Sequence, residues 1–246
     1  MFLQIYHVVL YQPILNLLVF FYNIIPGSDL GIAIILMTIL IKLIFSPLFV
    51  QSIKAQRAMQ TIQPKLNALK EKFKDDKEKL GAAVMQLYKD EKINPFSSCL
   101  PILIQLPFLI AVYQVFRSGL ASNNLQMLYS FIHNPGHLNA TFLGLINLAK
   151  VSLPMAVLAG LAQFWQSKSL LLRQPKGAPI IKNDKELNIA STMNKQMVYM
   201  MPIFTIFIGA SLPAGLTLYW FVITILGAIQ QSLIFKKMDQ KDAPTT

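Results

Sequence analysis

Charged residues are scarce in this chain of 246 residues: only 13% are Asp, Glu, Lys or Arg, whereas 54% are hydrophobic. A soluble domain carries roughly twice that charged share, because its surface needs polar side chains. So few charges exclude an ordinary soluble globule. The composition instead predicts an all-α, polytopic membrane protein in which residues 1–246 form a single membrane domain.

Cysteine and histidine are also nearly missing. The single cysteine, Cys99, excludes an internal disulfide framework, a structural zinc site and an iron–sulfur cluster, since each needs several ligands. His133 and His137 are four residues apart, but Pro135 and Gly136 break any helix that would bring them onto one face. We expect loop residues there, and the sequence predicts neither a metal site nor a cofactor.

Catalytic motifs are absent as well. The sequence contains no nucleophile elbow, P-loop, Rossmann glycine pattern or paired-carboxylate spacing. All but one of the 11 acidic residues lie in segments that we assign to the cytoplasm. The remaining acid, Asp29, stands at the start of an apolar run, where an N-cap role accounts for it. We therefore expect a protein that is not an enzyme.

Five apolar runs are long enough to cross a hydrocarbon core of ~30 Å at a helical rise of about 1.5 Å per residue. They cover residues 30–50, 96–116, 150–166, 195–211 and 215–235. Another run, 13–25, reaches only roughly 20 Å and carries Gln12, Asn16 and Asn23 along one stripe. The pattern predicts an interfacial helix there, with the first half of a spanning helix as the alternative.

The segment 51–95 is polar and holds ten basic and six acidic residues, so we expect it to lie in water. Its apolar residues follow heptad spacing on both sides of a polar break at 74–77, which is typical of an antiparallel helical hairpin. Pro64 should kink the first arm. The predicted seam consists of Met59, Ile62, Leu66, Leu69 and Phe73 on one arm and Leu80, Val84 and Leu87 on the other.

The formal charge of +11 could indicate a nucleic-acid partner, but its distribution indicates membrane orientation. Nineteen basic residues fall in the hairpin, in 167–197 and in the tail 236–246, whereas the opposite side holds Arg117 and Lys150. The positive-inside rule makes the basic side cytoplasmic. We expect a bacterial plasma-membrane protein with its N-terminus outside and its C-terminus in the cytoplasm, as five spans require.

One basic residue, Lys42, lies within an apolar run. A lysine near the bilayer centre costs about 2.5 to 3.5 kcal/mol, so it should face the bundle interior or a hydrated cavity. Snorkelling to the cytoplasmic headgroups is the alternative. Thr38 lies one turn away on the same helical face and extends a polar stripe. No span carries an acid to pair with Lys42, but polar side chains in other spans could line the same cavity or merely bond neighbouring helices: Gln105, Gln163, Gln166, Thr217, Tyr219 and Thr224.

Several motifs resemble one known family over most of the chain. They are the stretch 41–48 (IKLIFSPL), 58–65 (AMQTIQPK), Asn94-Pro95, 99–107 (CLPILIQLP), 199–202 (YMMP) and 213–220 (PAGLTLYW). In order and spacing these residues are similar to the YidC/Oxa/Alb membrane protein insertases.

The resemblance implies five membrane helices, a cytoplasmic hairpin and a hydrophilic groove open to cytoplasm and lipid but closed outside. It implies insertion and folding of nascent membrane proteins, alone or with the Sec translocon. The family usually has arginine at the Lys42 position, and its substrate contacts map onto Thr38 and onto Trp220, beside Tyr219. The short tail argues against strong autonomous ribosome binding. We expect lipid and substrate proteins as partners, and no direct contact with nucleic acid.

Two other classes compete with an insertase. A small-solute transporter or channel also places a charge and glutamines inside a bundle. The spans show no evident inverted repeat, however, and a 45-residue charged hairpin is superfluous to transport. A purely structural assembly factor would not need Lys42.

The 19-to-2 distribution of basic residues predicts the topology, and impermeant thiol labelling of intact cells tests it. Single cysteines are introduced at Asn124, at Lys77 and at the C-terminus of a Cys99→Ser variant. Only the Asn124 site should react, because the other two should face the cytoplasm. Labelling at Lys77 would overturn the orientation.

Overall fold

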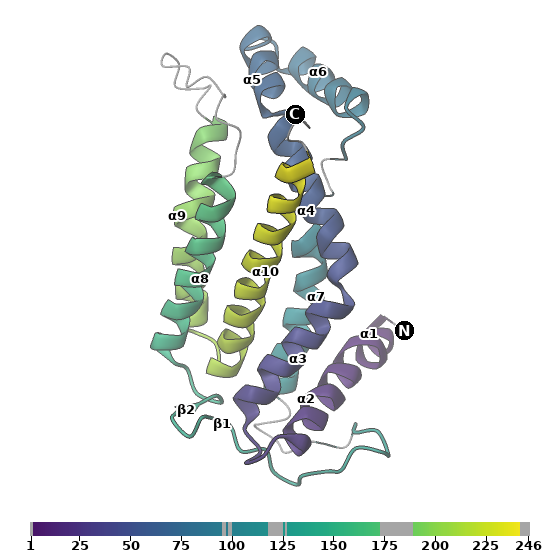
Figure 1. Ribbon diagram of the computed structural model, residues 1–246, viewed down its shortest axis with the longest axis vertical. Coiled ribbons are helices and arrows are strands. Elements are labelled where there is room, and N and C mark those ends of the chain that lie inside the picture. Colours follow the sequence, from purple (N-terminus) through teal and green to yellow (C-terminus); the bar gives the residue numbers. More distant parts are fainter. Residues whose placement is uncertain are drawn as a thin grey trace.

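The computed structural model describes residues 2–94, 97, 100–117, 125, 127–172 and 189–241. Helices make up most of it and form an elongated bundle (Figure 1). In chain order they are α1 (Phe2–Tyr6), a π-helical turn η1 (His7–Tyr11), α2 (Gln12–Ile24), α3 (Leu30–Ile44), α4 (Ser46–Thr61), α5 (Gln63–Lys72), α6 (Lys77–Asp90), α7 (Leu100–Val115), α8 (Leu153–Leu172), α9 (Ile189–Gly209) and α10 (Ala214–Lys241). Cys99 and Asn124 lie outside the described residues.

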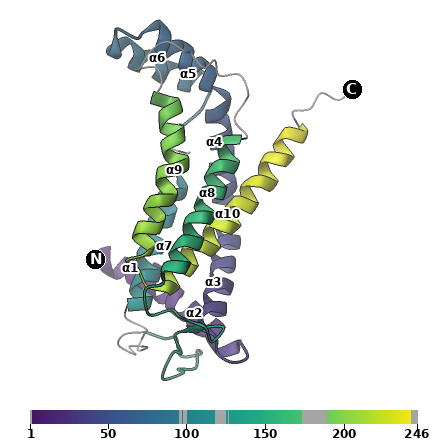
Figure 2. The same cartoon turned by 90° about the vertical axis from the view of Figure 1, so that its left-hand side faces the viewer.

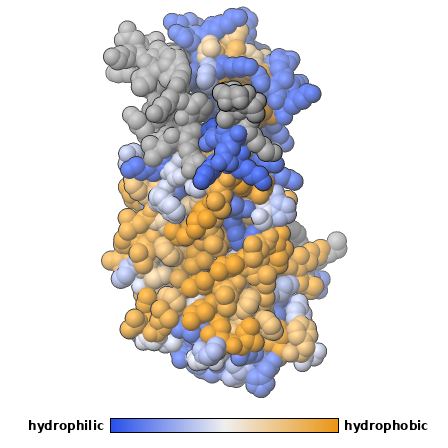
Figure 3. All heavy atoms as spheres, viewed as in Figure 1, coloured by the Kyte–Doolittle hydropathy of each residue, from blue (hydrophilic) through white to orange (hydrophobic). Residues whose placement is uncertain are grey.

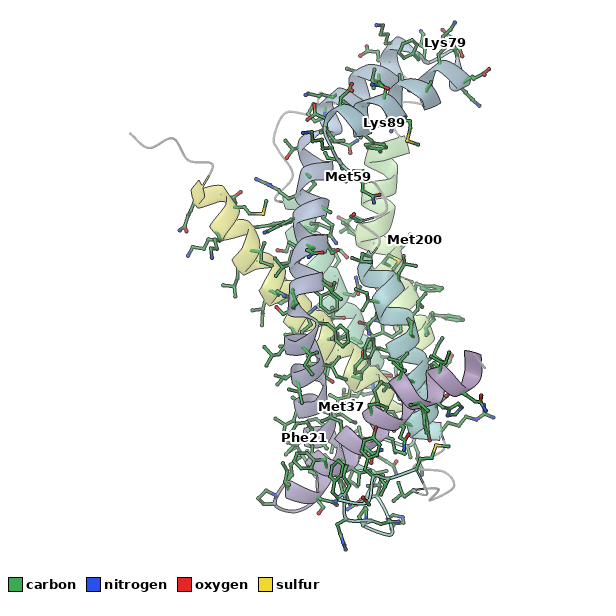
Figure 4. All side chains as sticks on the ribbon, turned by 90° about the vertical axis from the view of Figure 1, so that its right-hand side faces the viewer. Phe21, Met37, Met59, Lys79, Lys89 and Met200 are labelled. Atoms are coloured by element: carbon green, nitrogen blue, oxygen red, sulfur yellow. The ribbon has the colours of Figure 1, made fainter. Side chains whose placement is uncertain are left out.

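The N-terminal helix is longer than the predicted segment 13–25, so that prediction was wrong about where the helix begins. Helical structure runs without a gap from Phe2 to Ile24, and Pro13 occupies the first turn of α2 after the π-helical turn. Gln4–Ile24 is long and apolar enough to cross a membrane. In Figures 1 and 4 the helix nevertheless lies obliquely across the end of the bundle, packed on α3 and α7.

The polar stripe of α2 faces protein. The Asn16 amide donates to the carbonyl oxygens of Gln12 (2.7 Å) and Met127 (3.0 Å), and its own oxygen accepts from the Tyr129 N–H (2.6 Å). Asn23 donates to the His133 carbonyl at 2.7 Å. These bonds join α2 to a loop more than 100 residues away, so the stripe anchors that loop to the helix.

Each of the five predicted spans contains a helix, with different limits. Among the described residues, α10 is long and apolar enough to cross a membrane, and α3 with α4 qualifies if the bent pair counts as one span. The apolar stretches of α7 and α9 are shorter, Leu103–Val115 and Val198–Gly209. The described residues therefore contain two or three candidate spans by length and composition, the N-terminal helix included.

The predicted span 30–50 is broken in the middle. The axes of α3 and α4 meet at 68° around Phe45. Pro47 causes the break, because it has no N–H to donate and its ring clashes with the preceding turn. The bend is visible in Figure 1, and in both Figures 1 and 2 α4 leads toward α5.

The polar segment forms the expected hairpin, in which α5 packs against α6. Its first arm is divided at Ile62, and Pro64 stands in the first turn of α5. Ile62 and Leu66 are buried, and the other predicted seam residues are half-buried. Met59, Lys79 and Lys89 lie far from Phe21, at the opposite end of the molecule (Figure 4). The Lys79 N–H and ammonium hold the pKa of the Asp76 carboxyl below its usual value.

The helices α8 and α9 pack closely because small residues line their contact. Gly160 faces Ile206, and Ala156 faces Gly209. The turn 210–213 then joins α9 to α10, which confirms the tight hairpin that Pro213 and Gly215 predict.

A small β-hairpin, absent from the all-α prediction, covers the end of the bundle where α3 begins. Strands β1 (Thr141–Phe142) and β2 (Ile146–Asn147) pair antiparallel. The fully buried Leu148 follows, and its carbonyl accepts from the Gly215 N–H at 2.9 Å. The ring of Phe142 lies so close to Gly31 that no Cβ would fit there.

One carboxylate joins this hairpin to α3. Asp29 Oδ1 accepts from the Ile32 N–H at 2.9 Å, which confirms the predicted N-cap. Its Oδ2 accepts from the Leu143 N–H at 2.5 Å. Asp29 therefore caps the helix and fixes the hairpin at the same time.

We expect Asp29→Ala to destabilise the protein by about 1–3 kcal/mol, because both bonds are lost. Asp29→Ser keeps a capping oxygen and should lose only the hairpin bond. Amide hydrogen exchange across 141–148 should therefore accelerate in both variants, whereas exchange at the start of α3 should accelerate only in Asp29→Ala. Unchanged exchange in the hairpin of Asp29→Ser would show that the Leu143 bond does not hold it.

Candidate functional site

The ammonium of Lys42 lies between three helices. Lys42 belongs to the last turn of α3, and its Nζ lies 3.4 Å from the centre of the Phe49 ring on α4. A cation over an aromatic face is attracted by the ring quadrupole. The side chain is half-buried, so it is neither free in solvent nor sealed in the core.

The third helix is α10, which approaches Lys42 at a glycine. A Cβ built on Gly227 would lie 3.8 Å from Lys42 Nζ and 2.9 Å from Gln166 Nε2. Both polar ends thus approach the same point of the α10 backbone, one from α3 and one from α8. We call Lys42, Phe49, Gln166 and Gly227 the Lys42 cluster.

No carboxylate neutralises this charge within the described residues. The ion pairs there are Arg57–Asp239 at 2.7 Å, Lys65–Glu91, and Lys79–Asp76 at 2.9 Å. All of them belong to the hairpin or to the hairpin side of α4 and α10. Lys42 therefore offers an uncompensated positive charge inside a largely apolar bundle.

The other predicted groove residues make separate contacts. The buried Thr38 hydroxyl donates to the Ile34 carbonyl of its own helix at 2.6 Å. Gln105 Nε2 donates to the hydroxyl of the buried Tyr219 at 2.8 Å, which is the interhelical bond considered as their alternative role. Gln163 donates to Ser167 within α8 at 3.4 Å. Trp220 is half-buried. Of the predicted set, Gln166 is the residue whose amide lies beside the same glycine as the Lys42 ammonium.

Sequence reasoning missed Phe49 and Gly227. Phe49 is seven residues after Lys42, so helical spacing places the two on a similar face, but the 68° bend decides whether they meet. Gly227 stands alone within the apolar run of α10, where a glycine often marks a close approach. Those were the available signals, and neither identifies the neighbouring side chain.

A polar seam continues from the cluster toward the hairpin, between α4 and α10. Gln230 donates to the Ser46 hydroxyl at 3.1 Å, and Gln231 donates to Gln56 Oε1 at 3.2 Å. Arg57 and Asp239 close its far end. The side-chain oxygens of Ser52, Gln230 and Gln231 are buried without a hydrogen-bond partner among the described residues.

The surface agrees with a molecule embedded in lipid. On the face that Figure 3 draws, a broad hydrophobic belt crosses the middle, with hydrophilic residues at both ends. Large apolar side chains on the outside of α7, α8 and α9 are exposed, including Leu103, Leu161 and Phe207. Such a belt suits hydrocarbon and would be costly in water.

Comparisons with known proteins agree on one family. The family model described as "60Kd inner membrane protein" matches residues 20–241. A protein of Clostridium tetani named "Membrane protein insertase YidC" is 37% identical over 216 residues, which cover 88% of this chain and 86% of that protein. A protein of Fusobacterium nucleatum with the same name is 34% identical, with coverages of 85% and 88%. A longer relative from Pelobacter propionicus, again so named, is 34% identical over 93% of this chain and 39% of its own length.

The close approach of Gln166 to Gly227 can be tested by measuring the free energy of unfolding of variants at Gly227. Gly227→Ala should be neutral or stabilising, because alanine favours a helix by about 1 kcal/mol and the Gln166 amide can swing aside. Gly227→Leu should destabilise by about 1–3 kcal/mol through overpacking. Chemical denaturation in detergent micelles measures both, with Ile229→Phe on the exposed side of α10 as the control for added bulk.

A double-mutant cycle makes the test specific. In a Gln166→Ala background the penalty of Gly227→Leu should shrink by about 0.5 kcal/mol or more, because the clashing amide is gone. An unchanged penalty would mean that Gln166 does not lie against Gly227.

Proposed function

The chain belongs to the YidC/Oxa/Alb family of membrane protein insertases, the 60Kd inner membrane proteins, and we propose that it inserts membrane proteins through a hydrophilic groove centred on the Lys42 cluster. It is a membrane protein whose substrates are other membrane proteins. The observation that carries the groove is the half-buried ammonium of Lys42 between α3, α4 and α10, without a carboxylate partner among the described residues.

An ammonium without a carboxylate partner inside a bundle attracts a negatively charged group from outside the protein. A substrate segment that must cross the membrane often carries Asp or Glu, and moving such a charge through hydrocarbon costs several kcal/mol. Lys42 shortens that passage, because it offers opposite charge part of the way into the membrane. The segment is released afterwards, since a single ammonium among uncharged neighbours holds it only weakly.

The polar seam between α4 and α10 supports a route to this charge. Buried oxygens with no partner are costly unless water or a polar visitor satisfies them. Ser52, Gln230 and Gln231 supply such oxygens between the cytoplasmic hairpin and the Lys42 cluster. They could accept hydrogen bonds from water or from the N–H groups of an extended polypeptide entering from the cytoplasm.

Insertion by this route needs no nucleotide. Burial of an apolar substrate helix in lipid releases about 25 cal/mol per Å² of apolar surface, which drives the reaction. The exposed apolar sides of α8 and α9 let such a helix leave sideways into the bilayer. The groove then only lowers the barrier for the polar segment attached to it, so the protein works as a chaperone and insertase without catalytic residues.

The proposal also includes the topology: the chain crosses the membrane five times, with its N-terminus outside and its C-terminus in the cytoplasm. We propose that the N-terminal helix lies in the interface, which is supported by its oblique course in Figure 1 and by its hydrogen bonds to Met127 and His133. The hairpin of α5 and α6 is placed in the cytoplasm, where its basic surface suits contact with incoming chains, the ribosome or the Sec translocon. No observation favours a solute transporter over this assignment.

Substitution of Lys42 tests the groove. Lys42→Arg should retain insertion, Lys42→Gln should impair it, and Lys42→Glu should impair it most, above all for substrates that translocate acidic segments. Insertion into reconstituted vesicles is measured with paired substrates that differ only in the charge of the translocated segment. Raising the pH should weaken the parent before the Arg variant, because a guanidinium keeps its proton.

Phe49→Leu is the matched control, since it removes the ring but leaves the ammonium. It should lower insertion equally for acidic and neutral substrates, if at all. If Lys42→Glu inserts acidic substrates as well as the parent does, Lys42 is a snorkelling residue and the charged-groove mechanism is wrong.

A further inference from the structure

Most of the exposed large apolar side chains in the described residues lie on helices, but a few do not. Outside the helices they all fall between α7 and α8: Met127, Phe131, Leu143, Leu145 and Val151. Leu145 is 87% exposed, more than any other large apolar residue described, and Leu143 is 61% exposed. Both occupy the turn of the small β-hairpin, on either side of Gly144.

The turn conformation holds these leucines outward. Leu143 has φ 52° and Gly144 has φ 70°. A positive φ is common for glycine, but for leucine it costs roughly 1 kcal/mol or more. The Asp29 carboxylate accepts from the Leu143 N–H, and Phe142 packs on Gly31, so the structure enforces this conformation. A polar residue such as Asn would suit the position better in water.

The position of the turn fixes its depth. Asp29 is the N-cap of α3, whose sequence from Leu30 onward is apolar up to Lys42. A residue bonded directly to that cap lies where the hydrocarbon-spanning part of α3 begins. This level is the boundary between headgroups and acyl chains.

We propose that Leu143 and Leu145 form a lipid anchor that inserts into the membrane leaflet at the N-terminal end of α3. Two buried leucines would contribute several kcal/mol, at about 1.5–3 kcal/mol each, enough to offset the strained turn. The anchor ties the loop that covers this end of the bundle to the bilayer surface. Contact with lipid follows from the depth of the turn, whereas calling this leaflet the outer one rests on the proposed orientation.

Spin labelling in nanodiscs tests the anchor with the full chain. Leu145→Cys, His137→Cys and Met85→Cys are each made in a Cys99→Ser variant and labelled with a nitroxide. His137 is an exposed polar residue of the same loop, and Met85 is an exposed apolar residue of the hairpin. Collision rates are measured with oxygen, which concentrates in lipid, and with a water-soluble nickel chelate.

The label at 145 should collide with oxygen in preference to the chelate, several-fold more than the labels at 137 and 85. In the Asp29→Ser background this preference should fall, because the turn is no longer held at its depth. Equal chelate access at 145 and 137 would overturn the proposal, since the turn would then lie in water. Low access to both reagents at 145 would overturn it too, because a protein surface would be covering the leucines.

Discussion

An ammonium that has no carboxylate partner in the described part of the bundle is the constraint on which the other features depend. Without compensation, Lys42 would cost about 2.5–3.5 kcal/mol in hydrocarbon. The Phe49 ring offsets part of that cost by a cation–π contact, and the glycine of α10 leaves room for the ammonium. A carboxylate would offset more, but the pair would be neutral and would have nothing to offer an acidic segment. Incomplete compensation is what the proposed activity requires.

For Lys42 to act on a substrate from the cytoplasm, the contacts between helices must differ at the two ends of the bundle. Toward the hairpin, α4 and α10 meet through glutamines, serines and an ion pair, contacts that water can enter. At the other end a loop closes over the bundle. Phe142 packs on Gly31, Leu148 is buried, and the side chains of Asp29 and Asn16 are satisfied by backbone groups of that loop. The difference lies in side-chain chemistry and does not require a moving part. It favours access to Lys42 from one side only.

Much of this architecture follows from local rules, and the errors fall where local rules stop. The hairpin arms, the Asp29 cap and the α9–α10 turn depend on residues within a few positions of one another, and each was predictable. The N-terminal helix was cut short because Pro13 looks like a helix start, whereas a π-helical turn lets the helix continue through it. The bonds of Asn16 to Met127 and of Asp29 to Leu143 join residues more than 100 positions apart, and no periodicity encodes them. The β-hairpin was missed because two-residue strands have no readable alternation.

Local rules also fail to predict most of the candidate site. The free-energy cost of a charge in lipid identifies Lys42 from the sequence, but it does not identify the residues that surround Lys42. Thr38, Gln105, Gln163 and Tyr219 make hydrogen bonds of their own, whereas Gln166 approaches the Lys42 ammonium because a glycine faces both. Gly227 has no chemistry to attract attention, yet a Cβ added there would push the Gln166 amide aside and would touch the Lys42 ammonium. A position that acts by leaving space has no signature in one sequence, so the geometry of the bundle is needed to find it.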